Sequence, residues 1–359
     1  MKKVIFAAAG TAGHIEPALA VAHELKQLAP GTKITFIGTK GGLEKTLVSQ
    51  AGYPVVNITK AAFPRRLNKD ALMWKFRFLK SVVEAIRILK DADVVIGFGG
   101  YVCGTSYLAA KLSGVPIIAH EANAKKGMSN RLAVFCRATI LTAFPDGKHE
   151  VVGIPLRRSI VEFATKLGSE RAHLRNESLL SFKLDPSKPT ILIFGGSLGS
   201  RKFNSVVASI LDQLLANGFQ LIHAVGKNNE LPEPAAGYVP VSYIDDMPKA
   251  YAAADLAICR AGAVTTIETG LLGIYSVYVP LAIGNGEQVL NAQAVVSQGG
   301  GVMVADSAFS SDWILSRLPE LMKAALAWRD GSHTILSPLD AASVIAARAQ
   351  TVMVSQAKD

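Results

Sequence analysis

Short apolar runs alternate with longer amphipathic stretches along the first half of the chain. The apolar runs predict buried strands at "KKVIFAAAG", "KITFIGTKGG", "PVVNI", "DADVVIGFGG", "VPIIAHEAN" and "ATILTAF". Helical spacing predicts helices between several of them, including 17–28, 71–90 and 106–112, the first with Pro17 in its first turn. Strands that alternate with helices are typical of a parallel sheet covered on both faces.

The same pattern starts again in the second half. "PTILIFGGSLGSRKFNSVVASILDQLL" predicts a strand, a glycine turn and a helix, and later runs predict strands at "FQLIHAVG", "YVPVSYI", "DLAICRAGA", "YSVYVPL" and "GVMVA". Gly and Pro interrupt the pattern around Val151–Ile160, where we expect a joint. We predict an α/β protein of two Rossmann-like parallel-sheet domains, residues 1–155 and 156–336, facing across a cleft. We also predict a last helix over about 339–356, and the pattern leaves open on which of the two domains it packs.

The composition agrees with a globular protein of two domains. The 359 residues exceed one ordinary domain of about 150, and 50% of them are hydrophobic. The net charge of +10 indicates an anionic partner. Cys103, Cys136 and Cys259 are far apart, which favours reduced thiols in a cytosolic protein. The apolar run after Lys3 is too short for a secretion signal, and no run approaches the length of about 20 residues that spans a membrane.

The first glycine turn, Gly10–Gly13, lies between a predicted strand and a predicted helix. Free N–H groups and the positive end of a helix dipole favour an anion there. The turn does not fit G-x-G-x-x-G, and the second strand ends in Gly38–Lys40 without the acid that a nicotinamide cofactor needs. His14 follows the turn. It is either a general base beside a phosphate site or a histidine with a purely structural role.

Two further turns resemble the first. Gly195–Gly199 opens the second half, and "CRAGAVTTIETG" places Gly262 before another helix start. Glu268 falls two turns into that helix, where it either holds a ribose diol or is an exposed helical carboxylate. Further on, the stretch 285–295 predicts another helix. It carries Glu287, Gln288 and Asn291 on one face, which suits sugar hydroxyls or a solvated surface.

A basic and aromatic segment lies between residues 60 and 90. It favours a helix at the interface of an anionic membrane. The alternative is a two-faced helix that buries its aromatic side chains, and nucleic acid is a rival partner that no motif supports. Its basic residues are Lys60, Arg65, Arg66, Lys69, Lys75, Arg77, Lys80, Arg87 and Lys90, and its large apolar ones are Phe63, Leu67, Leu72, Met73, Trp74, Phe76 and Phe78.

Several motifs in fixed order resemble those of the MurG family. They are "AGTAGHIEPALAVAHEL", "GFGGYVCG", "HEANA", "VVGIPLR", "GGSLGSRKFN", "YIDDM", "ADLAICRAGAVTTIE" and "GEQVLNA". This family comprises bacterial UDP-N-acetylglucosamine:undecaprenyl-diphospho-muramoyl-pentapeptide N-acetylglucosaminyltransferases. The resemblance implies a GT-B fold whose last helix, about 337–359, returns to the first domain. It also implies a peripheral enzyme on the cytoplasmic side of the cell membrane that turns lipid I into lipid II with inversion, beside other cell-wall synthesis proteins.

The resemblance also assigns residues. It implies His14 as the base. It implies an acceptor site of Gly10, Thr11, Ala12, Gly13, Gly100, Tyr101 and Asn123. It implies a UDP-GlcNAc site of Thr11, Ala12, Gly13, Asn123, Arg157, Gly195, Gly196, Ser197, Ile244, Ala263, Val264, Thr265, Glu268, Glu287 and Gln288. In that second set, Arg157 and Ser197 hold the diphosphate, Ile244 meets uracil through its backbone, Glu268 binds the ribose, and Glu287 with Gln288 binds GlcNAc.

The sequence departs from the family pattern at several of these motifs. Alanine stands at Ala9, Ala12 and Ala122, where the family has Gly, Gly and Gln, and Ile154 replaces the Asn of an Asn-Pro pair. Leu198 and Glu287 replace glutamines, which removes a donor near the diphosphate and changes the polarity around the sugar. We expect no tightly bound metal, while a divalent ion that assists turnover is compatible with the sequence. The rival functions are a sugar-nucleotide 2-epimerase, a diacylglycerol glycosyltransferase, and a degenerate paralogue that only binds lipid diphosphate.

Overall fold

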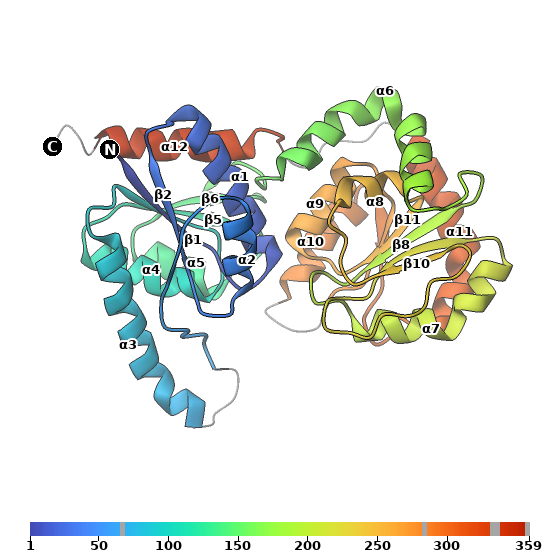
Figure 1. Ribbon diagram of the computed structural model, residues 1–359, viewed down its shortest axis with the longest axis horizontal. Coiled ribbons are helices and arrows are strands. Elements are labelled where there is room, and N and C mark those ends of the chain that lie inside the picture. Colours follow the sequence, from blue (N-terminus) through green and yellow to red (C-terminus); the bar gives the residue numbers. More distant parts are fainter. Residues whose placement is uncertain (65–68, 282–285, 331–337, 356–359) are drawn as a thin grey trace. The chain divides into compact units, whose positions relative to one another are not determined.

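The computed structural model describes residues 1–64, 69–281, 286–330 and 338–355. It contains two compact units. The first comprises Met1–Arg157 together with Ser337–Asp359, and the second comprises Arg158–Leu336. The sequence predicted the division after residue 155. Each unit is an α/β layer structure of its own (Figure 1).

The first unit is built on a fully parallel sheet of seven strands in the order β3-β2-β1-β4-β5-β6-β7. Its strands are β1 (Lys3–Ala7), β2 (Lys33–Gly38), β3 (Val55–Asn57), β4 (Val94–Gly97), β5 (Ile117–Glu121), β6 (Thr139–Thr142) and β7 (Glu150–Val151). Its helices are α1 (Ala12–Leu28), α2 (Leu43–Gln50), α3 (Lys69–Leu89), α4 (Tyr101–Leu112), α5 (Met128–Phe135) and α12 (Ala341–Ser355).

Alternation along β1 explains why helices cover both faces of this sheet. Val4 and Phe6 point into a core shared with α1, α2 and α12. Ile5 and Ala7 point into a second core shared with α3, α4 and α5. A strand that is apolar at every position therefore becomes the middle of a three-layer unit, as the sequence predicted.

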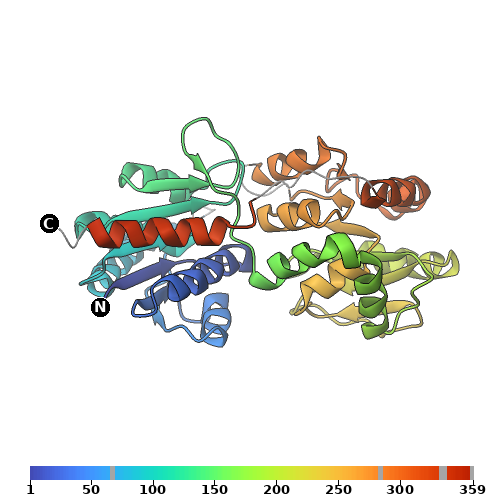
Figure 2. The same cartoon turned by 90° about the horizontal axis from the view of Figure 1, so that it is seen from above.

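The C-terminal helix α12 is part of the first unit. It lies along α1 (Figure 2), and Ile345, Ala346 and Ala349 join the same core as the α1 side chains. The Ser343 hydroxyl donates to the Glu24 carboxylate at 3.2 Å. The chain thus returns to its first sheet after completing the second unit.

The second unit repeats the plan with six parallel strands in the order β10-β9-β8-β11-β12-β13. Its strands are β8 (Thr190–Phe194), β9 (Gln220–Ala224), β10 (Tyr238–Val241), β11 (Leu256–Cys259), β12 (Ser276–Tyr278) and β13 (Gly301–Met303). Its helices are α6 (Arg158–Ser181), α7 (Arg201–Ala216), α8 (Met247–Ala253), α9 (Ala263–Leu271), α10 (Glu287–Val296) and α11 (Ser311–Asp330).

The strand order fixes where each unit can bind a ligand. In a doubly wound sheet, ligands bind beyond the carboxyl ends of the strands, at the point where the strand order reverses. That point lies between β1 and β4 in the first unit and between β8 and β11 in the second. The predicted glycine turns follow β1, β8 and β11, so all three lie at these switch points.

Some element boundaries differ from the sequence prediction. Helix α1 begins at Ala12 and α4 at Tyr101, so both predicted starts, at Pro17 and Ser106, were five residues late. Pro17 lies inside α1, where its missing N–H leaves one carbonyl of the first turn without an intrahelical partner. The prediction treated a tolerated proline as a helix start. The short strand β7 and the long helix α6 were not predicted.

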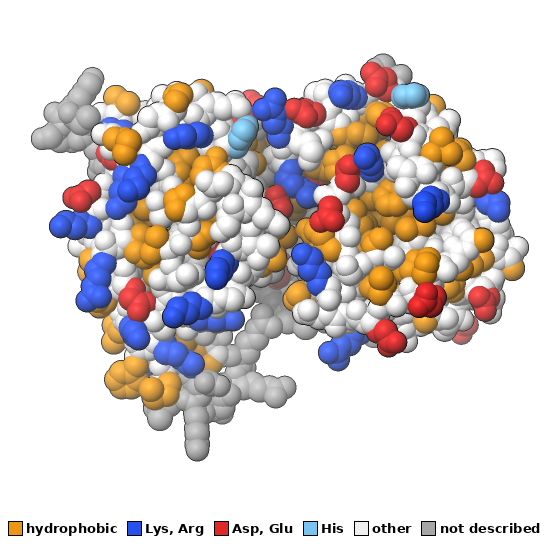
Figure 3. Space-filling model, in the orientation of Figure 1, with side chains coloured by type: hydrophobic (Ala, Val, Ile, Leu, Met, Phe, Trp, Pro, Cys, Tyr) orange, Lys and Arg blue, Asp and Glu red, His pale blue; other side chains and the backbone are white. Residues whose placement is uncertain are grey.

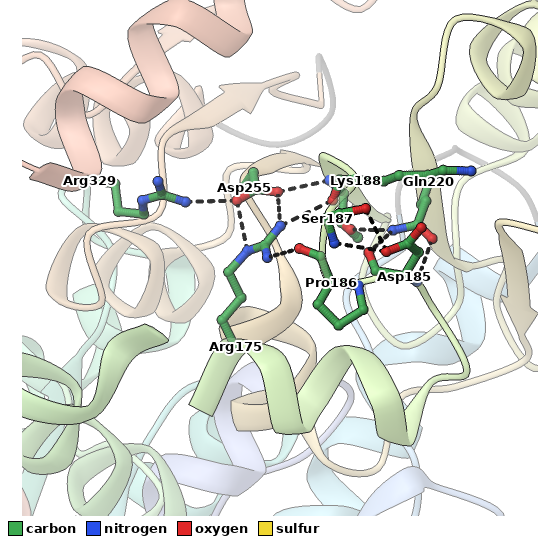
Figure 4. A network of polar contacts seen from close by, with 9 residues as sticks. Arg175, Asp185, Pro186, Ser187, Lys188, Gln220, Asp255 and Arg329 are labelled. Carbon is green, nitrogen blue, oxygen red and sulfur yellow. Dashed lines mark hydrogen bonds and ion pairs between the residues drawn. The ribbon is translucent and has the colours of Figure 1, made fainter. Parts of the chain in front are cut away.

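One carboxylate stabilises the second unit at the opposite edge from its glycine turns. Asp255 directly precedes β11 and is 6% exposed. Its oxygens accept from Arg175 Nη2 at 2.7 Å and from Arg329 Nη1 at 2.8 Å, and also from the Thr190 amide at 2.9 Å (Figure 4). Arg175 in addition donates to the Pro186 carbonyl at 2.8 Å. Asp255 therefore links α6, α11 and the start of β8.

We expect Asp255→Asn to lower the free energy of unfolding of the second unit by about 3–5 kcal/mol, because it leaves two partly buried guanidinium groups without their carboxylate. Trp313 and Trp328 lie in this unit, so tryptophan fluorescence in a Trp74→Phe background reports its urea transition alone. Asp312→Asn, at an exposed position of α11, is the control and should change the transition little. Equal effects of the two variants would contradict the account.

Candidate active site

The first glycine turn carries free amides at the start of α1. Thr11 is the N-cap residue in extended conformation, and its carbonyl accepts from the amides of His14 and Ile15 at 3.1 and 3.3 Å. Helix geometry leaves the amides of Ala12 and Gly13 without intrahelical partners. These two amides lie at the positive end of the helix dipole, where an anion is favoured.

His14 is held as a neutral imidazole with a defined tautomer. Its Nδ1 lies 3.2 Å from the Ala9 carbonyl oxygen and 3.3 Å from Thr11 Oγ1. A carbonyl only accepts, so Nδ1 carries the proton and Nε2 keeps its lone pair. Burial lowers the pKa of His14 below the 6.5 of an ordinary histidine, although the Ala9 carbonyl and the Glu121 charge oppose the shift. His14 can therefore accept a proton at neutral pH.

Glu44, which was not predicted as a site residue, stabilises this turn. It is fully buried, and its carboxylate accepts from the Thr39 amide at 3.0 Å and from the Tyr101 hydroxyl at 3.3 Å. It also accepts from the Gly10 amide at 3.4 Å. Since the Gly10 amide is directed at Glu44, the amides available to an anion are those further along the turn. A carboxylate in the first turn of α2, directly after a Gly-Gly pair, was the available signal.

The backbone at the end of β4 lies against the first turn. Gly100 is the N-cap residue of α4, and a Cβ there would lie 2.1 Å from the Ala9 carbonyl oxygen. Tyr101 follows it, with its ring against Gly10 and its hydroxyl 2.7 Å from Thr39 Oγ1. The structure thus brings Gly10, Gly100 and Tyr101 together at one switch point.

Asn123 comes from the end of the next strand and is fixed by a second missed residue, Glu121. The buried Glu121 carboxylate accepts from the Asn123 amide at 3.0 Å and from Asn123 Nδ2 at 3.2 Å. It also accepts from the Gly127 amide at 2.8 Å and from Asn130 Nδ2 at 3.0 Å. Glu121 stands inside the motif "HEANA", so the signal was present, but its role was visible only in three dimensions.

The second unit carries its own turn at Gly195–Gly199. The turn packs backbone on backbone against the residues that follow β9, because a Cβ on Gly199 would lie 2.0 Å from the Val225 carbonyl oxygen. Ser200 caps α7 by accepting from the Phe203 amide at 3.3 Å. Gly196 and Ser197 occupy the turn itself. Leu198, which stands where the family has glutamine, follows them and is 68% exposed.

A buried guanidinium lies beneath this turn. Arg260, at the end of β11, donates to Ser200 Oγ and to the Val279 carbonyl, both at 3.0 Å, and pairs with Asp306. It stacks on the Phe203 ring at 4.6 Å. Arg260 stands within the motif "ADLAICRAGAVTTIE", but the sequence does not indicate its role. It joins the two turns of the unit and adds positive charge where the sequence predicts the donor diphosphate.

Helix α9 positions the proposed nucleoside residues. Gly262 is its N-cap, and Ala263, Val264 and Thr265 form its first turn. Glu268 is 3% exposed and accepts from the Tyr251 hydroxyl at 2.9 Å, so the alternative of an exposed helical carboxylate was wrong. Ile244 is buried, three residues after the end of the edge strand β10.

The polar cluster of α10 divides by burial. Asn291 is buried and its Nδ2 lies 3.3 Å from the Ala261 carbonyl. Gln288 accepts from the Leu281 amide at 3.0 Å, and Glu287 begins the helix.

Arg157 is the last residue of the Met1–Arg157 segment of the first unit. Its charge partly offsets the effect of burial, which raises the pKa of Glu16. Within the described ranges, no group of three or more His, Cys, Asp or Glu residues could hold a metal ion.

Two Rossmann-like sheets, each with glycine turns at its switch point, are the architecture of the GT-B fold class. Residues 4–142 match the glycosyltransferase family 28 N-terminal domain and residues 190–337 match the C-terminal domain of the same family. The chain therefore belongs to glycosyltransferase family 28, in which its relatives are the MurG enzymes. The predicted fold class and family resemblance are confirmed.

The relatives are similar over most of the chain. A Streptomyces avermitilis protein is 44% identical over 321 residues, 87% of each chain, and is named UDP-N-acetylglucosamine–N-acetylmuramyl-(pentapeptide) pyrophosphoryl-undecaprenol N-acetylglucosamine transferase. A Corynebacterium efficiens protein with the same name is 43% identical over 349 residues, 96% of this chain and 95% of its own. The crystal structure of Acinetobacter baumannii MurG matches with a TM-score of 0.71 at 30% identity, over 98% of this chain and 100% of that one.

We expect His14 to titrate with a pKa below 6.5, because burial disfavours its charged form. Glu121 favours that charged form, so Glu121→Gln should lower the pKa of His14 further. Side-chain NMR titration of labelled histidines measures both values, with the exposed His173 of the second unit as the unaffected control. A His14 pKa above 6.5, or one that rises in the variant, would contradict the geometry.

Proposed function

We propose that the chain transfers N-acetylglucosamine from UDP to the C4 hydroxyl of the muramoyl sugar of lipid I, forming lipid II with inversion. The printed names of the relatives support this reaction. The single structural observation that carries the mechanism is His14, a neutral imidazole with a free Nε2 beside the start of α1.

In the proposed step, His14 Nε2 accepts the proton of the C4 hydroxyl as its oxygen attacks C1 of the donor sugar. The bond between C1 and the diphosphate oxygen breaks, and UDP departs with the electron pair. A positioned base contributes about 10²–10⁴-fold to such a step. The amides of Ala12 and Gly13 bind the acceptor diphosphate, with Gly10, Gly100, Tyr101 and Asn123 around it.

The second unit binds the donor in this proposal. The turn of Gly195, Gly196 and Ser197, with the first turn of α9 and Arg157, holds the diphosphate. Fixed amides and guanidinium groups stabilise the charge that develops on the departing UDP. Glu268 accepts from the ribose hydroxyls, Ile244 meets uracil, and Glu287 with Gln288 binds the sugar. The exposed Leu198 supplies no hydrogen-bond donor, which leaves the diphosphate to the backbone amides and Arg157.

The lipid-linked acceptor needs a membrane surface, and we propose that α3 supplies part of it on the cytoplasmic leaflet. Met73, Phe76, Leu79 and Val83 are 49–66% exposed along α3. The exposed basic residues among them are Lys75, Lys80, Arg87 and Lys90. Figure 3 shows basic side chains interspersed with hydrophobic ones in this part of the first unit. Such a surface suits anionic lipid, where each basic group contributes about 1 kcal/mol.

Not all the predicted aromatic residues belong to that surface. Trp74 Nε1 donates to the Ala61 carbonyl at 3.1 Å, and its ring packs against Phe63 and Phe78 at 5.1 Å. Arg65 and Arg66 lie outside the described residues. None of the helices in the described ranges is long and apolar enough to cross a membrane.

The test of the reaction is incubation of the full chain with UDP-GlcNAc and a short-chain lipid I analogue. We expect the disaccharide product with β linkage. UDP-ManNAc would instead indicate a 2-epimerase, glycosylation of added diacylglycerol would indicate the lipid transferase, and binding without turnover would indicate the degenerate paralogue.

We expect His14→Ala to lower turnover by about 100-fold or more while the KM for UDP-GlcNAc changes little, because the proton loses its acceptor. Steady-state kinetics with both substrates measure this. The control is His173→Ala, which should keep native turnover. Near-native turnover of His14→Ala would remove His14 from the role of base.

Glu268→Ala should weaken UDP binding by about 10–100-fold, since hydrogen bonds to a charged group contribute about 1.5–3 kcal/mol. Calorimetry with UDP and 2′-deoxy-UDP tests the contact itself. The native chain should prefer UDP, and the variant should lose that preference. A preference that survives in the variant would rule out the ribose assignment.

Phe76→Ser combined with Leu79→Ser should reduce the fraction of protein bound to phosphatidylglycerol vesicles, because both exposed side chains lose their apolar insertion. Leu326→Ser, at a position 43% exposed on the second unit, is the matched control. Co-sedimentation at low and high salt measures binding. Unchanged binding of the double variant would show that α3 does not dock.

A further inference from the structure

The ring of His14 lies directly against the backbone of Gly99. A Cβ on Gly99 would lie 2.9 Å from His14 Cδ2 and 3.0 Å from Nε2. Cβ atoms do not approach other heavy atoms that closely in real proteins, so one of the two groups would have to move. Gly99 also has a φ of +98°, which a residue with a Cβ adopts only with strain.

The Gly99 backbone cannot move away to make room. The Phe98 amide donates to the Ala7 carbonyl at 3.0 Å. Cys103 Sγ lies 2.9 Å from the Gly99 carbonyl oxygen and 3.0 Å from that of Ala7. Burial raises the pKa of Cys103 to about 12, so it remains a thiol that can donate. Gly100, the next residue, lies against the Ala9 carbonyl.

The ring of His14 would therefore move instead. Its Nδ1 is bound to the Ala9 carbonyl, and the Gly99 backbone borders the edge that carries Nε2. A methyl group on Gly99 would push this edge away and break the Nδ1 contact. The imidazole would lose both the tautomer and the direction that a base needs.

We propose that Gly99 is a positioning residue for proton transfer: its lack of a side chain lets the imidazole keep Nδ1 on the Ala9 carbonyl and Nε2 toward the acceptor hydroxyl. The inference rests on the proposed function of His14 as base. The two neighbouring glycines then have different roles. The absence of a side chain on Gly100 leaves space for the Ala9 carbonyl, and its absence on Gly99 leaves space for the His14 ring that this carbonyl orients.

The test compares Gly99→Ala with Gly41→Ala in the full chain. Gly41 has a φ of +76°, and in the described part of the chain no atom lies within 4 Å of where its Cβ would be. Gly41→Ala thus reports the backbone strain without the collision. We expect Gly99→Ala to lower kcat/KM for a lipid I analogue by about 100-fold, the order expected for a misplacement near 1 Å. The KM for UDP-GlcNAc should stay native in both variants.

A second readout follows the ring directly. Side-chain ¹⁵N shifts show which nitrogen of His14 carries the proton. We expect it on Nδ1 in the native chain and in Gly41→Ala, and redistributed to Nε2 in Gly99→Ala. A native tautomer and native kcat/KM in Gly99→Ala would overturn the inference.

A double variant keeps the test decisive if Gly99→Ala does not fold. In a His14→Ala background the methyl group has room, so the double variant should fold and be as active as His14→Ala alone. A double variant that still fails to fold would overturn the inference. Activity of His14→Ala alone would instead refute the proposed base, whereas an inactive His14→Ala with an active Gly99→Ala would refute only the role of Gly99.

Discussion

The close contact between the backbones that follow β1 and β4 is the constraint on which the first unit's chemistry depends. The Ala9 carbonyl lies where a side chain on Gly100 would be. The same carbonyl faces Nδ1 of His14 and so decides which ring nitrogen is free. A parallel sheet brings these two strand ends together at its switch point, so fold and tautomer follow from one arrangement.

The two units support their glycine turns with groups of opposite charge. Buried carboxylates, Glu44 and Glu121, hold the loops of the first unit. The buried guanidinium of Arg260 holds those of the second. This difference suits the proposed division of labour, in which the second unit stabilises the charge on departing UDP. In the first unit the charge of Glu121 favours the imidazolium that forms when His14 accepts a proton.

The sequence predicted the sheets well because each buried strand is a short apolar run between turn residues. Helix starts were less accurate, since Pro17 marks the interior of α1 and not its beginning. The glycine turns and His14 were visible as local motifs. Glu44 and Arg260 were not, because they act on Gly10 and Ser200, which are 34 and 60 residues away in the chain. The collision at Gly99 likewise depends on an ångström-scale distance that no residue pattern encodes.

The pH dependence of kcat/KM for the acceptor tests the central claim most directly. In the proposed mechanism a neutral His14 is the active form, so the rate should be constant above its pKa and fall as the pH drops below it. Because burial lowers that pKa, the acid limb should have its midpoint below 6.5 and coincide with the NMR titration of His14. A midpoint above 6.5, or an acid limb that His14→Ala retains unchanged, would contradict the account.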